Sequence, residues 1–184
     1  MGFFFKKADL YTPAYQVVGD EVAVISTSQG DIEIKLDGQG APIHVANFCE
    51  LAESGFYDGL KFHRYVPDFV IQGGCPNTRD MTPEDVAAGK TGPDGIPGTG
   101  GPGYEIKHEY DTNPNNSHVD GALGMARSQD PDSAGSQFYI CLGPQHRLDS
   151  GYTVFGVTTK GLDVAKALRA GDTINSIRIR HDEA

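Results

Sequence analysis

The sequence is poor in basic residues, in cysteine and in long apolar runs, and each shortage excludes a class of protein. Its 184 residues carry 15 lysines and arginines against 25 aspartates and glutamates, which gives a formal net charge of −10. The basic residues form no long run. Because phosphate binding requires clustered Lys and Arg, nucleic acid is not expected as a partner. The acidic excess is typical of a surface that serves solubility.

The chain also lacks the signals that direct a protein into or across a membrane. No stretch is long and apolar enough to predict a membrane-spanning helix. The N-terminal segment differs from a secretory signal, because its apolar run is limited to Phe3–Phe5 and its lysines follow that run. Myristoylation of Gly2 is not expected either, since Lys6 occupies the place of the required Ser or Thr. These features predict a cytoplasmic protein without membrane association.

The few cysteines and histidines predict neither disulfides nor a metal site. Cys49, Cys75 and Cys141 form no disulfide framework, and their spacing fits no metal motif. Cys49 and Cys141 are expected to be small core residues, whereas Cys75 follows two glycines and is expected to be more exposed. The six histidines include no pair four positions apart, so no metal is predicted. His63 is expected to be a neutral ring, hydrogen-bonded inside the fold.

A glycine-rich segment superficially fits a dinucleotide-binding motif. Residues Gly98–Gly103 match the pattern G-x-G-x-x-G. That motif requires a preceding strand and a helix that opens on its last glycine. Here a proline-rich loop precedes the segment, and the strand-like Tyr104–Lys107 follows it. The sequence therefore predicts no cofactor.

The length fits one domain with a sizeable core. We expect residues 1–20 to be an extension that packs on a domain spanning 21–184, because the extension carries aromatic residues in Phe3–Phe5, Tyr11 and Tyr15.

Short apolar segments separated by turn residues indicate an all-β barrel or sandwich. Alternation predicts strands at 22–25, 32–36, 104–106, 122–125, 137–142, 153–157 and 174–179. Helices are predicted from Pro42 to Gly55 and from Gly161 to Ala170, with a helical turn from Thr82 to Ala88 inside a long loop at 77–103.

The stretch Phe62–Gly74 carries the most distinctive pattern. Arg64 and Gln72 are separated by an even number of positions and can share one face of extended backbone. Pro67 is expected to divide the stretch into two strands, because proline cannot donate to a strand ladder. An alternative interpretation is a buried strand pair in which Arg64 meets an acid.

Together with later segments, this stretch resembles the cyclophilins, the peptidyl-prolyl cis-trans isomerases. The resemblance rests on Phe-His-Arg and Pro-x-Phe-x-x-Gln-Gly-Gly within Phe62–Gly74, followed in family order by Gly121–Ala126, Gly135–Ile140, Leu148-Asp149 and Tyr152–Gly156. It implies a closed eight-stranded antiparallel β-barrel with a helix over each open end. It also implies an enzyme that rotates X-Pro bonds in unfolded protein chains and needs no cofactor. Nothing in the sequence demands more than a monomer, so a monomer is expected.

The resemblance assigns catalysis to Arg64, Gln72 and Phe69. Arg64 would donate to the amide nitrogen of the X-Pro bond, and Gln72 would hold the guanidinium or bind the substrate carbonyl. Residues with an implied role in substrate binding are Val70, Ala126, Arg127, Gln137, Tyr139, Leu148 and Tyr152. Phe69, Val70, Tyr139 and Leu148 would line the proline slot, although apolar residues of this kind are also typical of ordinary core.

The remaining implied residues would bind the parts of the substrate peptide other than the proline ring. Gln137 would bind peptide backbone, while Ala126 and the main chain of Arg127 would hold the residue before proline. Tyr152 stands where many relatives carry histidine.

Several positions depart from the family pattern. Val70 replaces a common methionine, Tyr139 a frequent phenylalanine and Arg127 a frequent asparagine. Arg147 stands where cyclosporin-sensitive members carry tryptophan, so weak cyclosporin binding is expected. Two other hypotheses remain open: a module that binds proline-containing segments without catalysis, and a barrel whose loop at 77–103 docks on a partner protein.

Overall fold

The computed structural model describes residues 9–182, and within them the fold is mainly β. Its strands are β1 (Glu21–Thr27), β2 (Gly30–Leu36), β3 (Arg64–Val66), β4 (Val70–Gly73), β5 (Ala122–Met125), β6 (Phe138–Cys141), β7 (Val154–Lys160) and β8 (Ile174–His181). The α-helices are α1 (Pro42–Glu53), α2 (Pro83–Ala87) and α3 (Leu162–Ala167), and single 3₁₀ turns lie at Pro76–Thr78 and His146–Leu148.

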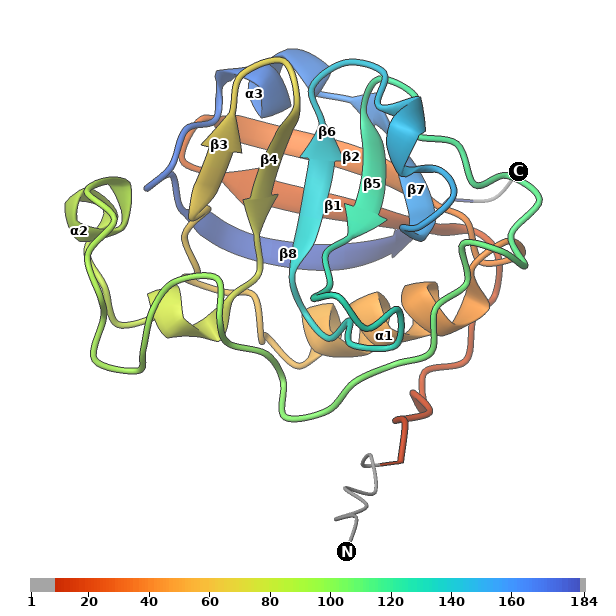
Figure 1. Cartoon of the computed structure of the whole chain (residues 1–184). Helices are drawn as coiled ribbons and strands as arrows, with labels where there is room; N and C mark the ends of the chain where they lie inside the picture. The colour runs from red at the N-terminus through yellow and green to blue at the C-terminus, as the bar shows by residue number, and fades with distance from the viewer. Residues whose placement is uncertain (1–8, 183–184) are drawn as a thin grey trace, which may run out of the picture.

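The strands form one antiparallel sheet of eight strands in the order β3-β4-β6-β5-β7-β2-β1-β8. The sheet curls on itself, and Figure 1 shows α1 and α3 at its opposite ends. The segment before β3 is linked to the start of β8 and the residues just before it by backbone hydrogen bonds, such as Phe62 N to Asp172 O at 2.9 Å and Ile174 N to Leu60 O at 2.8 Å. The mainly-β, eight-stranded antiparallel prediction is confirmed at this level.

Local sequence signals predicted most of the elements near their observed bounds. Pro42 begins α1 as expected, and Gly55, just beyond its end, adopts a left-handed φ of 77° that glycine tolerates. Thr82 caps α2, since its hydroxyl oxygen accepts the backbone N–H of Asp85 at 3.1 Å. Pro67 separates β3 from β4, as predicted.

Two elements differ from the prediction. The strand expected at 104–106 is absent: Ile106 forms one isolated bridge with Ala134, while Glu105 O accepts the backbone N–H of Tyr11 at 2.8 Å. This segment therefore bonds partly to the N-terminal region in place of joining the sheet. The second long helix is shorter than expected and ends at Ala167, because Leu168 is already extended at φ −66° and ψ 145°.

The N-terminal segment packs on the domain over its described part. The Tyr11 ring lies 4.1 Å from the Tyr104 ring, centroid to centroid, and the Tyr11 hydroxyl donates to Glu50 Oε2 at 2.5 Å. Tyr15 packs against the main core. Phe3–Phe5 lie outside the described residues. Between residues 9 and 182, no helix has the length and apolarity needed to traverse a bilayer.

The main core fills the interior of the curled sheet and continues beneath α1. Phe48 on α1 packs edge-on against Phe138 at a centroid distance of 5.6 Å. Cys49 and Cys141 are buried, as predicted. The expectation of a more exposed Cys75 is wrong, because that residue is 0% exposed. Cys75 is covered by the loop that follows α2, which contacts it through Gly98, 23 residues later in the chain. The glycine pair before Cys75 predicts a turn but does not indicate this distant contact.

The N-terminus of α1 is capped by a residue distant in sequence. Ala41 precedes the helix and has no side chain able to cap it. The carboxylate of Glu109 accepts the backbone N–H of His44 at 2.8 Å and that of Ile43 at 3.2 Å, and it also lies 2.7 Å from His44 Nδ1. Because Glu109 is only 4% exposed, these donors have little access to water.

Replacing Glu109 by Ala should therefore lower the free energy of unfolding by about 2–3 kcal/mol, since the helix loses its cap and buried donors lose their acceptor. Thermal unfolding followed by circular dichroism should show a fall in Tm of about 5–10 °C. Glu84→Ala on the exposed first turn of α2 is the matched control and should cost less than about 1 kcal/mol. Equal effects from both variants would contradict the capping role of Glu109.

Candidate active site

The β3–β4 hairpin places the two predicted polar residues side by side. Arg64 and Gln72 are direct cross-strand partners, so they share one face of the sheet. Arg64 Nη1 donates to Gln72 Oε1 at 3.3 Å, and Arg64 is exposed. The alternative of a buried arginine paired with an acid is therefore wrong. Asp68 at the turn adopts a φ of 58°, which is uncommon for a residue other than glycine.

Beside this pair lies a pocket of about 330 Å³ with an apolar wall. All of the predicted site residues except Gln137 line it: Arg64, Phe69, Val70, Gln72, Ala126, Arg127, Tyr139, Leu148 and Tyr152. The Arg64 guanidinium carbon lies 5.7 Å from the centre of the Phe69 ring, so the charge borders the pocket mouth. Arg147 covers the same ring, with its guanidinium carbon at 4.6 Å.

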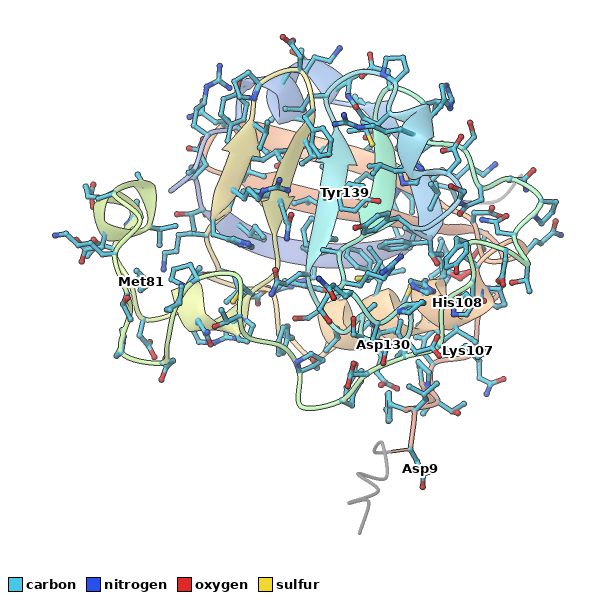
Figure 2. All side chains as sticks on the ribbon, viewed as in Figure 1. Asp9, Met81, Lys107, His108, Asp130 and Tyr139 are labelled. Atoms are coloured by element: carbon cyan, nitrogen blue, oxygen red, sulfur yellow. The ribbon has the colours of Figure 1, made fainter. Side chains whose placement is uncertain are left out.

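The apolar residues of this pocket form a cluster separate from the main core. Its buried members are Val70, Ala122, Tyr139, Cys141 and Val154, and the half-buried side chains packed on them are Phe69, Ala126, Leu148 and Tyr152. The main core lies on the other face of β4 and β6, because alternate residues of a strand point to opposite faces. Figure 2 shows Tyr139 over the middle of the sheet. An outer cluster that opens into a pocket suits an apolar ligand group.

Gln137 borders a second, adjoining cavity of about 640 Å³, which shares Gln72, Ala126 and Arg127 with the first. Gln137 Oε1 accepts from Gln72 Nε2 at 3.2 Å. Gln137 Nε2 donates to the backbone oxygens of Gly98 and Gly100, both at 2.8 Å. The amide of Gln137 is thus engaged by protein groups at both ends.

A buried histidine that no sequence motif marks supports the pocket wall. His118 Nε2 lies 2.7 Å from the Tyr139 hydroxyl, and His118 Nδ1 lies 2.7 Å from Asp149 Oδ1. Burial lowers the pKa of His118 and raises that of Tyr139 well above its ordinary value, so both are neutral. His118 Nδ1 therefore donates a hydrogen bond to the Asp149 carboxylate, and His118 Nε2 accepts a hydrogen bond from the Tyr139 hydroxyl. These two hydrogen bonds fix the orientation of the Tyr139 ring that lines the pocket.

Gly124 makes room for the same ring. A Cβ atom at this position would lie 2.3 Å from Tyr139 Cζ, well inside van der Waals contact. Gly124 faces Tyr139 directly across β5 and β6. The tyrosine therefore fits because its strand neighbour has no side chain.

His63 differs from its predicted state in one respect. Among residues 9–182, its Nδ1 is the one buried side-chain nitrogen or oxygen that has no hydrogen-bond partner. The expected hydrogen bond inside the fold is thus wrong at this atom. Burial, with a smaller contribution from the neighbouring charge of Arg64, lowers the pKa of His63 to about 4. The ring is neutral at physiological pH, as predicted.

The site has the groups for charge stabilisation, and the described residues include no cluster of three or more His, Cys, Asp or Glu side chains arranged to hold a metal. Its chemistry-bearing groups are a guanidinium at the pocket rim and an amide that orients it. A fixed cation beside an apolar slot can stabilise negative charge or a lone pair that develops on a bound peptide. This geometry suits a site that holds an apolar group beside an electrostatic donor.

Comparison with known proteins identifies the family. The family described as cyclophilin type peptidyl-prolyl cis-trans isomerase matches residues 22–183. A peptidyl-prolyl cis-trans isomerase of Synechococcus elongatus is 42% identical over 164 residues, which are 88% of this chain and 98% of that protein. Peptidyl-prolyl cis-trans isomerase B of Bacillus subtilis is 45% identical over 148 residues, 80% of this chain and 90% of the relative.

The fold agrees with solved structures of the same kind. A Cryptosporidium parvum cyclophilin, crystallised in the presence of the dipeptide Ala-Pro, superposes with a TM-score of 0.71 at 25% identity, covering 88% of this chain and 99% of that one. The chain belongs to the cyclophilin-type peptidyl-prolyl cis-trans isomerase family. Its membership supports isomerase activity over a binding module without catalysis.

The lowered pKa of His63 predicts a pH dependence of stability. Its folded pKa of about 4 lies below the ordinary 6.5, so between these values the unfolded chain binds a proton that the folded chain does not. The stability associated with neutral His63 is complete above pH 6.5 and is lost progressively as the pH falls toward 4. Urea unfolding at pH 7 and pH 5 should show a smaller loss in His63→Gln than in the wild type.

The lowered pKa of His118 contributes in the same direction, but it is common to both proteins and cancels in the comparison. Parallel pH profiles of the two proteins would show that His63 titrates normally in the folded state.

Proposed function

We propose that Arg64 is the catalytic group of this peptidyl-prolyl isomerase and that the 330 Å³ pocket holds the substrate proline. The observation that carries the proposal is the exposed Arg64 guanidinium, held by Gln72 at the rim of an apolar pocket beside Phe69. The Ala-Pro dipeptide present with the related Cryptosporidium parvum protein supports proline-containing peptides and unfolded chains as substrates.

The reaction needs no nucleophile. Rotation about an X-Pro bond is slow because its barrier is about 18–20 kcal/mol, set by delocalisation of the nitrogen lone pair into the carbonyl. In the twisted transition state the nitrogen is pyramidal and basic. An N–H of Arg64 can donate to this lone pair, which the planar ground state does not offer, so the interaction stabilises the transition state selectively.

The other site residues position the peptide. Phe69, Val70, Tyr139 and Leu148 bury the proline ring, and burial of this apolar surface supplies binding energy. Ala126 and Arg127 border both cavities, and the residue before proline would lie against Ala126 and the Arg127 main chain. Tyr152 completes the wall, and the Arg127 guanidinium carbon stacks 4.5 Å from the centre of its ring.

We further propose a role in protein folding as a cytoplasmic monomer, with residues 1–20 as an extension to a domain that begins at residue 21. The family match from residue 22 onward supports this division. The backbone bonds between the segments before β3 and β8 support a closed barrel whose ends are covered by α1 and α3.

Arg64→Ala should reduce kcat/KM for an X-Pro peptide by at least about 100-fold, the loss seen when one preorganised electrostatic donor is removed. A protease-coupled isomerisation assay measures this rate. Arg178→Ala is a matched control, because Arg178 is an exposed strand arginine that pairs with Asp58 and does not line the pocket. Equal rates for the wild type and Arg64→Ala would reject the assignment.

Cyclosporin should bind weakly, because Arg147 stands where sensitive members carry tryptophan and its guanidinium lies over the Phe69 ring. Isothermal titration calorimetry should give a Kd at least tenfold lower for Arg147→Trp than for the wild type, since an aromatic ring supplies more apolar contact. A wild-type Kd as low as that of the Trp variant would show that this position does not limit binding.

A further inference from the structure

From the contacts of the Gly98–Gly100 loop, we infer that Cys75 is a positioning residue for Arg64, acting through that loop and the amides of Gln137 and Gln72. The inference rests on the proposed catalytic role of Arg64. It assigns a function to a buried cysteine and to a glycine-rich motif that lacks the strand and helix required for dinucleotide binding.

The Gly98–Gly100 loop is hydrogen-bonded to the Cys75 thiol. Cys75 Sγ accepts the backbone N–H of Gly98 at 3.2 Å and that of Gly100 at 3.3 Å. Figure 1 shows the segment that follows α2 passing below the lower ends of β4 and β6. Asn77 adds a second anchor by donating to Ile96 O at 3.0 Å and to the Thr99 hydroxyl at 3.1 Å.

Glycine is required where the loop approaches these anchors. Gly98 has a φ of 98°, which side-chain-bearing residues rarely adopt, and a Cβ there would lie 3.2 Å from the His63 ring. A Cβ on Gly100 would lie 2.5 Å from Asn77 Oδ1. The two glycines, one on each side of Thr99, thus let the N–H groups of residues 98 and 100 reach one sulfur.

Held in this way, the loop directs its carbonyl groups at Gln137. The backbone oxygens of Gly98 and Gly100 both accept from Gln137 Nε2 at 2.8 Å. A carbonyl oxygen can only accept, so the NH₂ end of this amide must face the loop, and both of its hydrogens are used. A flipped Gln137 would place its own oxygen against two others.

The orientation of Gln137 then fixes that of Gln72. Gln137 Oε1 can only accept, and it does so from Gln72 Nε2 at 3.2 Å. This leaves Gln72 Oε1 to face Arg64, whose guanidinium can only donate and whose Nη1 lies 3.3 Å away. The series of hydrogen bonds begins at loop carbonyls, which only accept, and ends at a guanidinium, which only donates. Both amides between them can therefore have only one orientation. The Gln137 amide is hydrogen-bonded to protein groups at both ends, which suits a positioning role, and its expected binding of peptide backbone stays a prediction.

Removing the sulfur should therefore affect catalysis through Arg64. In Cys75→Ala the loop N–H groups lose their acceptor, and kcat should fall about tenfold, the scale of one to two hydrogen bonds. KM should change less than twofold, because the apolar pocket is intact. Cys75→Ser retains an acceptor and should recover most of the rate, whereas Cys49→Ala, which removes a buried thiol from α1, should leave kcat unchanged.

A double-mutant cycle separates positioning from a general structural effect. In an Arg64→Ala background, assayed at higher enzyme concentration, Cys75→Ala should slow the residual rate less than twofold. Gln137→Met, which has similar length but no amide, is a second variant that interrupts the same chain and should behave alike. An undiminished kcat in either folded Cys75→Ala or folded Gln137→Met, or an equal further loss in the Arg64→Ala background, would overturn the inference.

The side-chain amide signals of Gln72 and Gln137 in ¹H–¹⁵N NMR spectra give a readout independent of activity. They should shift in Cys75→Ala and return toward wild type in Cys75→Ser. An inactive wild-type protein would refute the proposed function, whereas unchanged amide signals in Cys75→Ala would refute the positioning chain alone.

Discussion

The hydrogen bond between Arg64 and Gln72 is the interaction on which the proposed active site depends. This bond holds the positively charged Arg64 guanidinium at the edge of an apolar pocket. The guanidinium is exposed enough for a peptide to reach it. The hairpin makes this possible by placing both residues opposite each other on adjacent strands. The curled sheet then has two functions: its inner face buries the main core, and its outer face supplies the pocket.

A second feature is that residues outside the pocket fix the side chains that line it. His118 and Asp149 orient the Tyr139 ring, Gly124 provides its space, and Gln137 connects Gln72 to a glycine-rich loop. Such preorganisation matters for an enzyme without a nucleophile or metal in its proposed mechanism, since its rate enhancement comes from donors fixed before the transition state forms. The loop after α2 belongs to this support, because the backbone oxygens of Gly98 and Gly100 accept hydrogen bonds from Gln137.

The sequence predicted those parts of the structure that depend on local rules. Even spacing placed Arg64 and Gln72 on one face, proline divided β3 from β4, and Thr82 capped α2. The outer-face pocket followed from family resemblance, because apolar residues alone do not distinguish a ligand pocket from core. Every implied site residue except Gln137 lies on that pocket.

What could not be predicted depends on contacts between distant segments. Glu109 caps a helix that begins 67 positions earlier, and no local pattern marks it as a cap. Cys75 is buried by a loop that returns 23 residues later, and the single bridge of Ile106 replaces an expected strand. For Cys75 a neighbouring glycine pair, and for Ile106 alternation, gives the local tendency of the chain, whereas Glu109 has no local signal. In all three cases the partner that decides the outcome lies elsewhere in the fold.

The central claim is that Arg64 interacts more strongly with the twisted amide than with the planar one. NMR exchange spectroscopy on an Ala-Pro-containing peptide measures both its affinity and its rate of cis-trans interconversion on the protein. Arg64→Ala should keep the peptide Kd within about threefold while the interconversion rate falls at least about 100-fold. A loss of affinity as large as the loss of rate would contradict the account, since Arg64 would then bind ground state and transition state alike.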